Sequence, residues 1–279
     1  MDYSKVAYNI RKCLEEYIQK NELKSLVIGV SGGVDSAVCL ALARSVCDEL
    51  GIPLIGRSLP YITNKKEELN RAKDIGHLFC HDFEEDSIHI LVQPFFFYLG
   101  LYRDNKKATK IRKGNIIART RMVILYDIAQ QNEGMVLSTD NYTEYLLGFW
   151  TLHGDHNDYG IIQNLWKTEV YELLEYLSNT KEETTVKQME SLLLCAHSVP
   201  TDGLGITSSD MEQIGCKDYE ETDKILKRYL ELSSMSMLYT DSDEKEYKKL
   251  SKHPAIIRHL NTQFKRNWPI NLTREQIIS

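Results

Sequence analysis

The strongest constraint on the fold is a short apolar run at residues 26–30, which ends at one serine and two glycines. A long apolar segment follows at residues 36–50 and ends at Gly51, and another short apolar run occupies residues 53–56. The two runs have the length of strands, and the segment between them has the length of a helix. Strand, glycine turn, helix and strand in this order form a βαβ unit, so the sequence predicts a parallel sheet.

The rest of the chain continues this alternation of helical and extended patterns. We expect further helices at residues 65–77, 115–131, 167–178 and 241–252, further strands at 87–92 and 135–138, and loops at 153–164 and 199–209. No internal repeat, low-complexity tract or linker interrupts the 279 residues. We therefore predict a single domain, residues 1–279, of the α/β class with a parallel sheet.

The predicted helix at residues 115–131 carries apolar residues on more than one face. A helix with this pattern is buried on several sides, either between layers of one core or across a subunit interface. Ile116, Val123 and Ile124 form a stripe that a single sheet would leave uncovered. We therefore expect a homodimer joined at this helix, and the alternative is that C-terminal helices of the same chain cover the stripe.

Composition and charge exclude several classes of protein. The formal net charge of −6 argues against bulk binding of nucleic acid, for which a protein usually presents a basic face. No apolar run approaches the roughly 18 residues of a membrane helix, and the N-terminus lacks the apolar stretch of a signal peptide. The six cysteines are scattered without C-x-x-C spacing, which favours reduced packing residues over a zinc site. These features predict a cytoplasmic protein with no membrane or nucleic-acid partner.

The segment S-G-G-V-D-S at residues 31–36 carries the clearest chemistry. It lies between a predicted strand and a predicted helix, where glycines let backbone N–H groups approach a polyanion and the helix N-terminus adds donors and a positive dipole end. Ser31 and Ser36 can donate hydroxyl groups, and Asp35 can hold a magnesium ion. The plainer alternative is a serine-capped helix after a tight turn. The segment is neither a Walker A motif nor G-x-G-x-x-G.

This segment resembles the pyrophosphate-binding loop of the N-type ATP pyrophosphatases, which split ATP between its α and β phosphates and form an adenylated substrate. Two further segments are similar to ammonia-dependent NAD synthetases. K-G-N-I-I-A-R-T-R-M at residues 113–122 matches K-G-N-x-x-A-R-x-R-M, and S-T-D-N-Y-T-E at 138–144 matches G-T-D-x-x-x-E apart from its first residue. Later pieces continue the pattern in order, so the resemblance covers almost the whole chain: G-F at 148–149, G-D at 154–155, K-T at 167–168, P-T at 200–201 and F-K-R-N-W-P at 264–269.

The resemblance implies a three-layer α/β/α fold of the adenine nucleotide α-hydrolase-like type. It implies ATP-dependent amidation of deamido-NAD to NAD with ammonia, through an adenylated carboxylate and with release of AMP and pyrophosphate. It also implies Mg²⁺ as cofactor, ATP as co-substrate and a homodimer. Because only about 30 residues precede the phosphate loop, we expect no glutaminase domain. The ammonia would then be free or delivered by a separate protein.

Carried over residue by residue, the resemblance implies catalytic roles for Asp35 and Lys167 and metal binding by Asp35 and Glu144. The residues implied for deamido-NAD are Arg119, Asp158, Phe264 and Lys265. The residues implied for ATP are Gly29, Val30, Ser31, Gly32, Gly33, Val34, Asp35, Ser36, Arg57, Thr139, Lys167 and Thr201.

Elementary considerations support the proposed metal and phosphate ligands. Glu144 lies six residues after Ser138, which ends a predicted buried strand. Ligand-binding groups in parallel sheets gather at the carboxyl ends of strands, so Glu144 and Asp35 could meet the same magnesium–pyrophosphate unit. Lys167 could offset charge on the leaving pyrophosphate. The plainer alternatives are a solvated helix carboxylate for Glu144 and a surface lysine at a helix start for Lys167.

Other assignments also have structural alternatives. Arg119 lies on the helix that we expect to be buried, and a buried arginine needs an anionic partner, either the substrate or a structural salt bridge. Thr201 could close over ATP or be a plain turn threonine. Asp158 and Lys265 could complete the dinucleotide site or lie in exposed loops.

The chain departs from the family pattern at several positions, and these concern substrate contacts rather than the ATP chemistry. Ser58 stands where relatives often have arginine, which leaves Arg57 as its candidate replacement. Leu152 and His153 precede G-D where many relatives have lysine. Phe264 replaces a histidine and Met211 an acid.

Two other functions are compatible with the phosphate loop. The first is another adenylating amido-ligase or thiolase of the same superfamily, although the acidic charge and the lack of paired cysteines weigh against RNA thiolation. The second is a nucleotide sensor that has lost turnover. The joint presence of Asp35, Glu144 and Lys167 disfavours the sensor.

Overall fold

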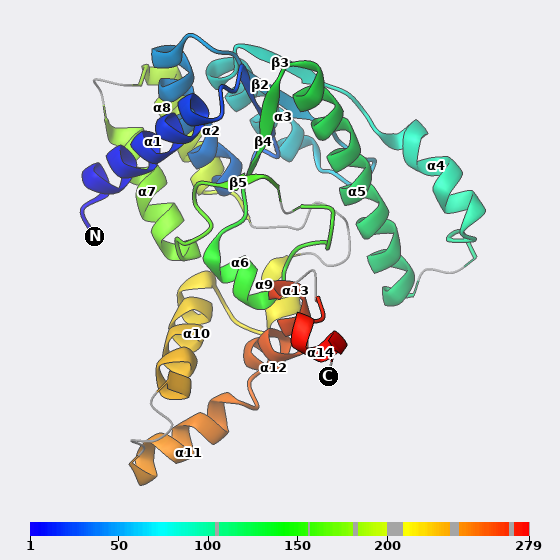
Figure 1. The fold of residues 1–279 in the computed structure, drawn as a ribbon, viewed down its shortest axis with the longest axis vertical. Coiled ribbons are helices and arrows are strands. Elements are labelled where there is room, and N and C mark those ends of the chain that lie inside the picture. Colours follow the sequence, from blue (N-terminus) through cyan, green and yellow to red (C-terminus); the bar gives the residue numbers. More distant parts are fainter. Residues whose placement is uncertain are drawn as a thin grey trace.

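The computed structural model describes residues 1–103, 106–155, 157–180, 184–199, 209–234, 240–267 and 271–278. Within these residues the core is a parallel sheet of five strands in the order β3-β2-β1-β4-β5 (Figure 1). The strands are β1 (Ser25–Gly29), β2 (Leu54–Ser58), β3 (Asp82–Glu85), β4 (Gly134–Ser138) and β5 (Tyr159–Gly160). Val27 of the central strand pairs with Ile55 on one side and with Val136 on the other. The parallel sheet predicted from the βαβ pattern is confirmed.

Helices cover both faces of the sheet, because successive side chains of a strand point to opposite faces. Leu26 and Ile28 pack into one core with α1 (Tyr3–Lys20), α2 (Val34–Leu50), α3 (Lys66–Phe79), α7 (Lys167–Asn179) and α8 (Val186–Ala196). Val27 lies in a second core with α4 (His89–Tyr98) and α5 (Lys107–Gln131). The three-layer α/β/α arrangement is therefore also confirmed.

A further group of helices packs around its own apolar cluster, which includes Leu146, Ile214, Leu226 and Ile256. It comprises α6 (Tyr142–Leu147), α9 (Asp210–Ile214), α10 (Tyr219–Ser234), α11 (Asp241–Leu250) and α12 (Pro254–Asn261), followed by α13 (Gln263–Arg266) and α14 (Arg274–Ile278). In Figure 1 this group extends away from the sheet, with α11 farthest out. Because α10 contacts both α6 and α7, the group is connected to the helices that follow β4 and β5.

One predicted strand is wrong. Residues 87–92 form the lead into α4 and its first turns, and the edge strand is β3 instead. The sequence of β3, D-F-E-E, is acidic because an edge strand faces solvent and tolerates charge. The apolar run was interpreted as a strand because α4 exposes several of its large apolar side chains. The sequence of α4 therefore lacks the periodicity of an amphipathic helix.

Other boundaries differ less from the expectation. The loop expected at 153–164 contains the short strand β5, and the helix expected from residue 115 begins earlier, at Lys107. The loop expected at 199–209 lies outside the described residues, apart from its two ends. None of the described helices combines the length and apolar character needed to cross a bilayer.

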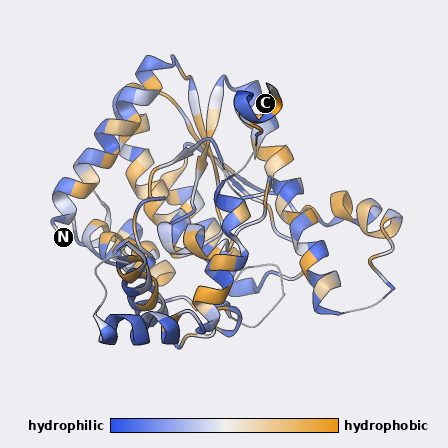
Figure 2. Cartoon of the chain, turned by 60° about the horizontal axis from the view of Figure 1, so that its bottom comes forward, coloured by the Kyte–Doolittle hydropathy of each residue, from blue (hydrophilic) through white to orange (hydrophobic). Residues whose placement is uncertain are grey.

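The apolar surface of α5 is only partly covered. Ile116 and Ile124 pack against the second core, whereas Val123 is 71% exposed. The neighbouring α4 exposes Phe97 and Tyr98 almost fully. Figure 2 shows hydrophobic colouring over much of α4, at the right edge of the view. Within the described part of the chain, the C-terminal helices therefore do not cover Val123.

Candidate active site

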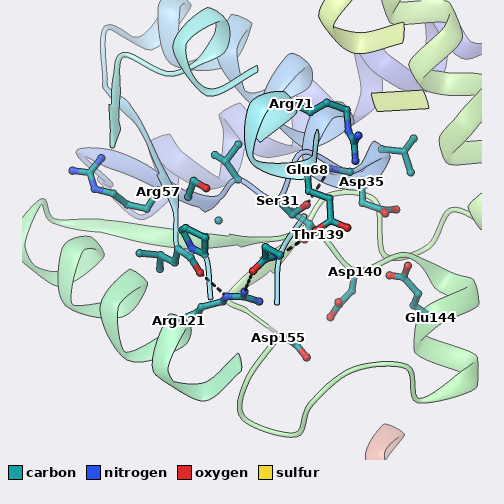
Figure 3. Close-up of a pocket in the computed structure, with 18 of the residues that line it drawn as sticks. Ser31, Asp35, Arg57, Glu68, Arg71, Arg121, Thr139, Asp140, Glu144 and Asp155 are labelled. Atoms are coloured by element: carbon teal, nitrogen blue, oxygen red, sulfur yellow. Dashed lines mark hydrogen bonds between the residues drawn. The ribbon is translucent and has the colours of Figure 1, made fainter. Parts of the chain in front are cut away.

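A cavity of about 270 Å³ opens at the carboxyl ends of the central strands (Figure 3). Its wall includes Ser31 after β1, Leu59 after β2 and Thr139 after β4. The chain continues from β1 to β2 on one side and from β4 to β5 on the other. The cavity thus lies where the strand order reverses, the usual position of a ligand in an open parallel sheet.

The phosphate loop forms one wall, and its backbone is held in place by α3. Gly32 has φ +76°, and a Cβ there would lie 2.7 Å from the backbone of both Glu68 and Ala72. Only glycine fits this close approach without strain. The Arg71 Nε–H donates to the Gly32 carbonyl at 3.0 Å, which fixes the loop from the α3 side.

Inside the loop, the side chains of Ser31 and Ser36 form a hydrogen bond with each other. The Ser31 hydroxyl oxygen accepts from the Gly33 N–H at 3.2 Å and lies 3.0 Å from the Ser36 hydroxyl oxygen, which also donates to the Gly33 carbonyl. Gly33 is the N-cap of α2 and has no side chain with which to cap it. The first-turn N–H groups of α2 are therefore available to a bound anion.

Three charged side chains meet beside this loop. The Lys167 Nζ lies 2.5 Å from an Asp35 carboxylate oxygen and 3.0 Å from a Glu144 carboxylate oxygen. Lys167 is only 2% exposed, so the ammonium group depends on these carboxylates for charge compensation. The Asn141 amide donates to the second Asp35 oxygen at 2.9 Å, which fixes that carboxylate from the other side.

The pKa values in the cluster reflect burial and the excess of acids. Burial raises the pKa of Glu144 to about 8, with Asp35 and Asp140 adding to the shift and Lys167 opposing it. Burial lowers the pKa of Lys167, but attraction to Asp35 and Glu144 outweighs it and raises the pKa well above its ordinary value. The lysine therefore stays charged.

Each charged group stands at the start of a different helix. Asp35 lies in the first turn of α2, Glu144 lies in the first turn of α6, and Lys167 is the first residue of α7. The positive ends of the helix dipoles thus converge on one point. This arrangement favours a polyanion such as a pyrophosphate group.

The expectation that Arg119 is buried is wrong, because Arg119 is exposed and its Nε–H donates to the Leu152 carbonyl. Two residues turn an α-helix by about 200°, so Arg121 points to the other side of α5 and lines the cavity. The Arg121 guanidinium donates to the Leu59 carbonyl at 2.9 Å and to the Asn64 side chain at 3.3 Å. Arg121 thereby holds the segment between β2 and α3 against the cavity (Figure 3).

Most residues expected to bind ATP come together. The cavity wall contains Gly29, Val30, Ser31, Gly33, Val34, Asp35, Arg57, Thr139 and Lys167. Gly32 and Ser36 belong to the same loop but do not line the cavity. Arg57 also forms ion pairs with Asp82 at 3.0 Å and Glu84 at 3.5 Å on the neighbouring strand. Thr201 lies outside the described residues.

The residues expected to bind deamido-NAD do not line this cavity. Arg119 and Phe264 are exposed. Asp158 is exposed too, and its carboxylate accepts from the Val136 N–H at 3.0 Å and the Tyr126 hydroxyl at 2.6 Å. Asp158 thus joins β4 to α5 at the edge of the sheet.

Lys265 is half-buried among backbone carbonyls. Its Nζ donates to the Gly148 carbonyl at 2.8 Å and also to the Trp150 carbonyl. Burial and the nearby Arg258 lower the pKa of Lys265 to about 8. These contacts anchor α13 to the turn after α6.

Sequence reasoning missed several residues of the wall. Arg71, Glu68, Arg121, Asp140 and Asp155 all line the cavity. The segments that resemble the family motifs contain Arg121, Asp140 and Asp155, so the sequence could have indicated these three residues. It gave no indication for Arg71 and Glu68, because charged residues on an amphipathic helix usually face solvent.

The donor set around Asp35 fits a nucleotide-bound cation rather than a protein-only metal site. Among the described residues, no group of three or more His, Cys, Asp or Glu side chains is arranged to hold a metal ion. Magnesium typically binds one or two carboxylates and completes its shell with phosphate oxygens and water. Asp35 and Glu144 are two carboxylates that would suit such an ion, and the ammonium of Lys167 contacts both of them.

Comparisons with known proteins point to one family. The sequence profile of the NAD synthase family matches residues 6–269. The NH(3)-dependent NAD(+) synthetase of Thermoplasma acidophilum is 32% identical over 275 residues, which cover 98% of this chain and 99% of that protein.

Two solved structures share the fold. The NMN synthetase of Francisella tularensis superposes with a TM-score of 0.73 at 25% identity, covering 98% of both chains. The NH3-dependent NAD synthetase of Campylobacter jejuni superposes with a TM-score of 0.68 at 22% identity, covering 98% of this chain and 100% of that one.

Proposed function

The chain belongs to the NAD synthase family, and we propose that it amidates deamido-NAD to NAD with ATP and ammonia. The observation that carries the proposal is the contact of Lys167 with Asp35 and Glu144 beside the phosphate loop. This contact places a cation, two carboxylates and uncapped helix N–H groups around one point. Such a set suits the departure of pyrophosphate from ATP.

We assign the cavity to ATP. The phosphate loop and Arg71 would surround the phosphates, while Arg121 keeps the segment after β2 in position as the opposite wall. The four residues expected to bind deamido-NAD all lie outside this cavity. The dinucleotide therefore needs a second site next to this one.

The reaction would proceed in two displacements. An oxygen of the substrate carboxylate attacks the α-phosphorus of ATP, the bond to the bridging oxygen breaks, and pyrophosphate leaves. Ammonia then attacks the carbonyl carbon of the adenylated carboxylate, loses a proton and expels AMP. Lys167 stabilises the charge that accumulates on the phosphates in the first step.

We assign a magnesium ion bound with ATP to Asp35 and Glu144. Its positive charge supplies stabilisation of the leaving pyrophosphate. Lys167 would then exchange carboxylate contacts for phosphate contacts, because both are anionic partners within reach of a flexible side chain. Asn141 would keep Asp35 oriented throughout.

We propose a homodimer in which the partner copy completes the dinucleotide site. The exposed apolar side chains of α4 and α5, among them Phe97, Tyr98 and Val123, supply a surface of the required character. Arg119 lies on the same helix as Val123 and is exposed. A phosphate or carboxylate of deamido-NAD could bind it there.

A second candidate substrate has specific support. The Francisella structure that covers 98% of this chain is an NMN synthetase. Amidation of the corresponding mononucleotide would use the same cavity, because its reacting carboxylate is the same group. Comparing kcat/KM for deamido-NAD and for nicotinate mononucleotide decides between the two.

The test of the reaction uses the purified chain with ATP, Mg²⁺, ammonium and deamido-NAD labelled with oxygen-18 in the carboxylate. We expect NAD, AMP and pyrophosphate in equal amounts, with label in the AMP. Glutamine in place of ammonium should give no NAD. Formation of ADP and phosphate would move the chain to another class of ligase, and ATP binding without turnover would favour a sensor.

A further inference from the structure

Asp223 is a buried carboxylate that the reaction above does not use. It lies on α10, is 2% exposed, and comes from the helix group outside the sheet layers. One oxygen accepts from the Thr143 hydroxyl at 2.5 Å and the other accepts from the Thr168 N–H at 3.0 Å. Asp223 therefore contacts the first turn of α6 and the first turn of α7 at the same time.

The Glu169 carboxylate accepts from the Trp166 N–H at the start of α7, and the contact with Asp223 adds a partner for a first-turn N–H group. The N-cap residue of α7, Trp166, makes no side-chain cap hydrogen bond to the first turn. The Lys167 N–H instead donates to the Thr143 hydroxyl oxygen at 2.9 Å, and the Thr168 N–H donates to Asp223. A carboxylate at a helix N-terminus satisfies free N–H groups and interacts favourably with the dipole. The start of α7 is thus fixed by side chains from α6 and α10.

Both helix starts carry a charged group of the site. Lys167 is the first residue of α7, and Glu144 follows Thr143 in α6. The Lys167 Nζ and the Glu144 carboxylate lie 3.0 Å apart. A shift of either first turn would change this distance and the direction in which the ammonium group points.

We propose that Asp223, acting through Thr143 and Thr168, is a positioning residue that holds Lys167 and Glu144 in the geometry needed for pyrophosphate departure. The inference rests on the proposed function. Asp223 touches neither nucleotide nor metal in this assignment. A positional error of about 1 Å in a catalytic group costs on the order of 100-fold in rate.

The chain offers a matched set of variants. Thr143→Val removes the hydroxyl that donates to Asp223 and accepts from Lys167 but keeps the shape of the side chain. Thr143→Ser restores that hydroxyl. The control is Thr222→Val, because Thr222 is as buried as Thr143, lies next to Asp223 and bonds to the Asp218 carbonyl and the Cys216 side chain, both in the segment just before α10.

The test measures kcat, KM and amide hydrogen exchange in all three variants and in Asp223→Asn. We expect Thr143→Val and Asp223→Asn to lose about 10- to 100-fold in kcat with KM changed less than about threefold, since positioning affects the transition state. Thr143→Ser should recover to within about threefold, and Thr222→Val should keep the wild-type kcat. Exchange at the Lys167 and Thr168 amides should accelerate only in Thr143→Val and Asp223→Asn.

Two results would overturn the inference. One is an unchanged kcat in Thr143→Val. The other is equal exchange at the α7 start in wild type and Thr143→Val, which can be measured whether or not the chain is a ligase. A wild type that forms no AMP would instead refute the proposed function. Hydrogen exchange at the Lys167 and Thr168 amides would then still test whether Asp223 and Thr143 fix the start of α7.

Discussion

Lys167 and Asp35 lie 132 residues apart in the chain, and their charged atoms lie 2.5 Å apart in the fold. The contact joins the start of α2 to the start of α7 across the cavity. It is almost completely shielded from water, so each group is the main counter-charge of the other. Several expected outcomes depend on this pair and its neighbours.

Lys167→Met should destabilise the ligand-free protein. The substitution leaves Asp35 and Glu144 without their buried cation, and breaking a buried pair costs about 3–5 kcal/mol. Urea unfolding at pH 8 measures the loss. The exposed Lys224→Met, on α10, is the control and should change stability by less than about 0.5 kcal/mol. Equal stability of the two variants would contradict the counter-charge role of Lys167.

Asp35→Ala and Glu144→Ala should each lower turnover by about 100-fold or more, as loss of a preorganised charge-stabilising group does. The deficit should be largest at limiting Mg²⁺, because each variant removes one proposed metal ligand. Steady-state rates over a magnesium titration measure it. Glu190→Ala removes an exposed acid of α8 outside the cavity and should behave as wild type. Near-full activity of either site variant at limiting magnesium would remove that residue from the metal site.

Glu144→Gln should make the ligand-free protein less sensitive to alkaline pH. The pKa of Glu144 is raised to about 8, so its ionised form is disfavoured in the folded state. The protonated Glu144 carboxyl stabilises the folded state fully below the ordinary pKa of about 4.5. This stabilisation is lost as the pH rises through about 8. The stability of the Gln variant relative to wild type should therefore grow between pH 5 and pH 8, by at most about 1.4 kcal/mol per pH unit. If the free energies of unfolding of wild type and Glu144→Gln change equally between pH 5 and pH 8, the raised pKa of Glu144 is wrong.

Val123→Glu should dissociate the proposed dimer into monomers. Val123 is 71% exposed on α5, so the substitution costs the monomer little but places a charge in the proposed interface. Sedimentation at micromolar concentration should show a dimer for wild type and a monomer for the variant, with weaker binding of deamido-NAD. Val186→Glu is the control, because Val186 is 69% exposed on α8, in the opposite helical layer. A fully active wild-type monomer of about 32 kDa would rule out the dimer.

Gly32→Ala should damage the phosphate loop more than Gly51→Ala damages the end of α2. Both glycines have positive φ, which costs other residues about 1–2 kcal/mol. At Gly51 an added Cβ meets no atom within 4 Å, whereas at Gly32 it meets backbone atoms of α3 at 2.7 Å. Gly32→Ala should therefore lose more stability and at least about tenfold in ATP affinity. Calorimetric titration with ATP distinguishes the two, and equal affinities would contradict the close packing.

The sequence predicted the central architecture because its signals were local. A buried strand, a glycine turn and a helix are each encoded in a few consecutive residues, and so are the ends of β1 and α2. The family segments then placed Asp35, Glu144 and Lys167 near one another. The family assignment and the fold were thus available from the chain alone.

The errors arose where the decisive information was not local. Arg119 and Arg121 are both arginines on one apolar helix, and only the rotation of α5 against the sheet decides which one enters the cavity. Residues 87–92 were taken for a strand because the exposed apolar side of α4 removes the amphipathic pattern. Asp223 looks like a surface acid of α10 and is recognisable only once α6 and α7 pack against it.

The contact of Asp223 with α6 and α7 has a consequence for synthesis. Chains emerge from the ribosome N-terminus first, and the sheet together with α7 is complete before α10 is made. A nascent chain ending at α8 already contains Asp35, Glu144 and Lys167, yet it lacks the carboxylate that fixes the start of α7. A chain released before α10 is made would then bury Asp35, Glu144 and Lys167 without the hydrogen bonds that join Asp223 to α6 and α7. If Asp223 positions Lys167 as proposed, the site becomes competent only after the chain has been translated through α10.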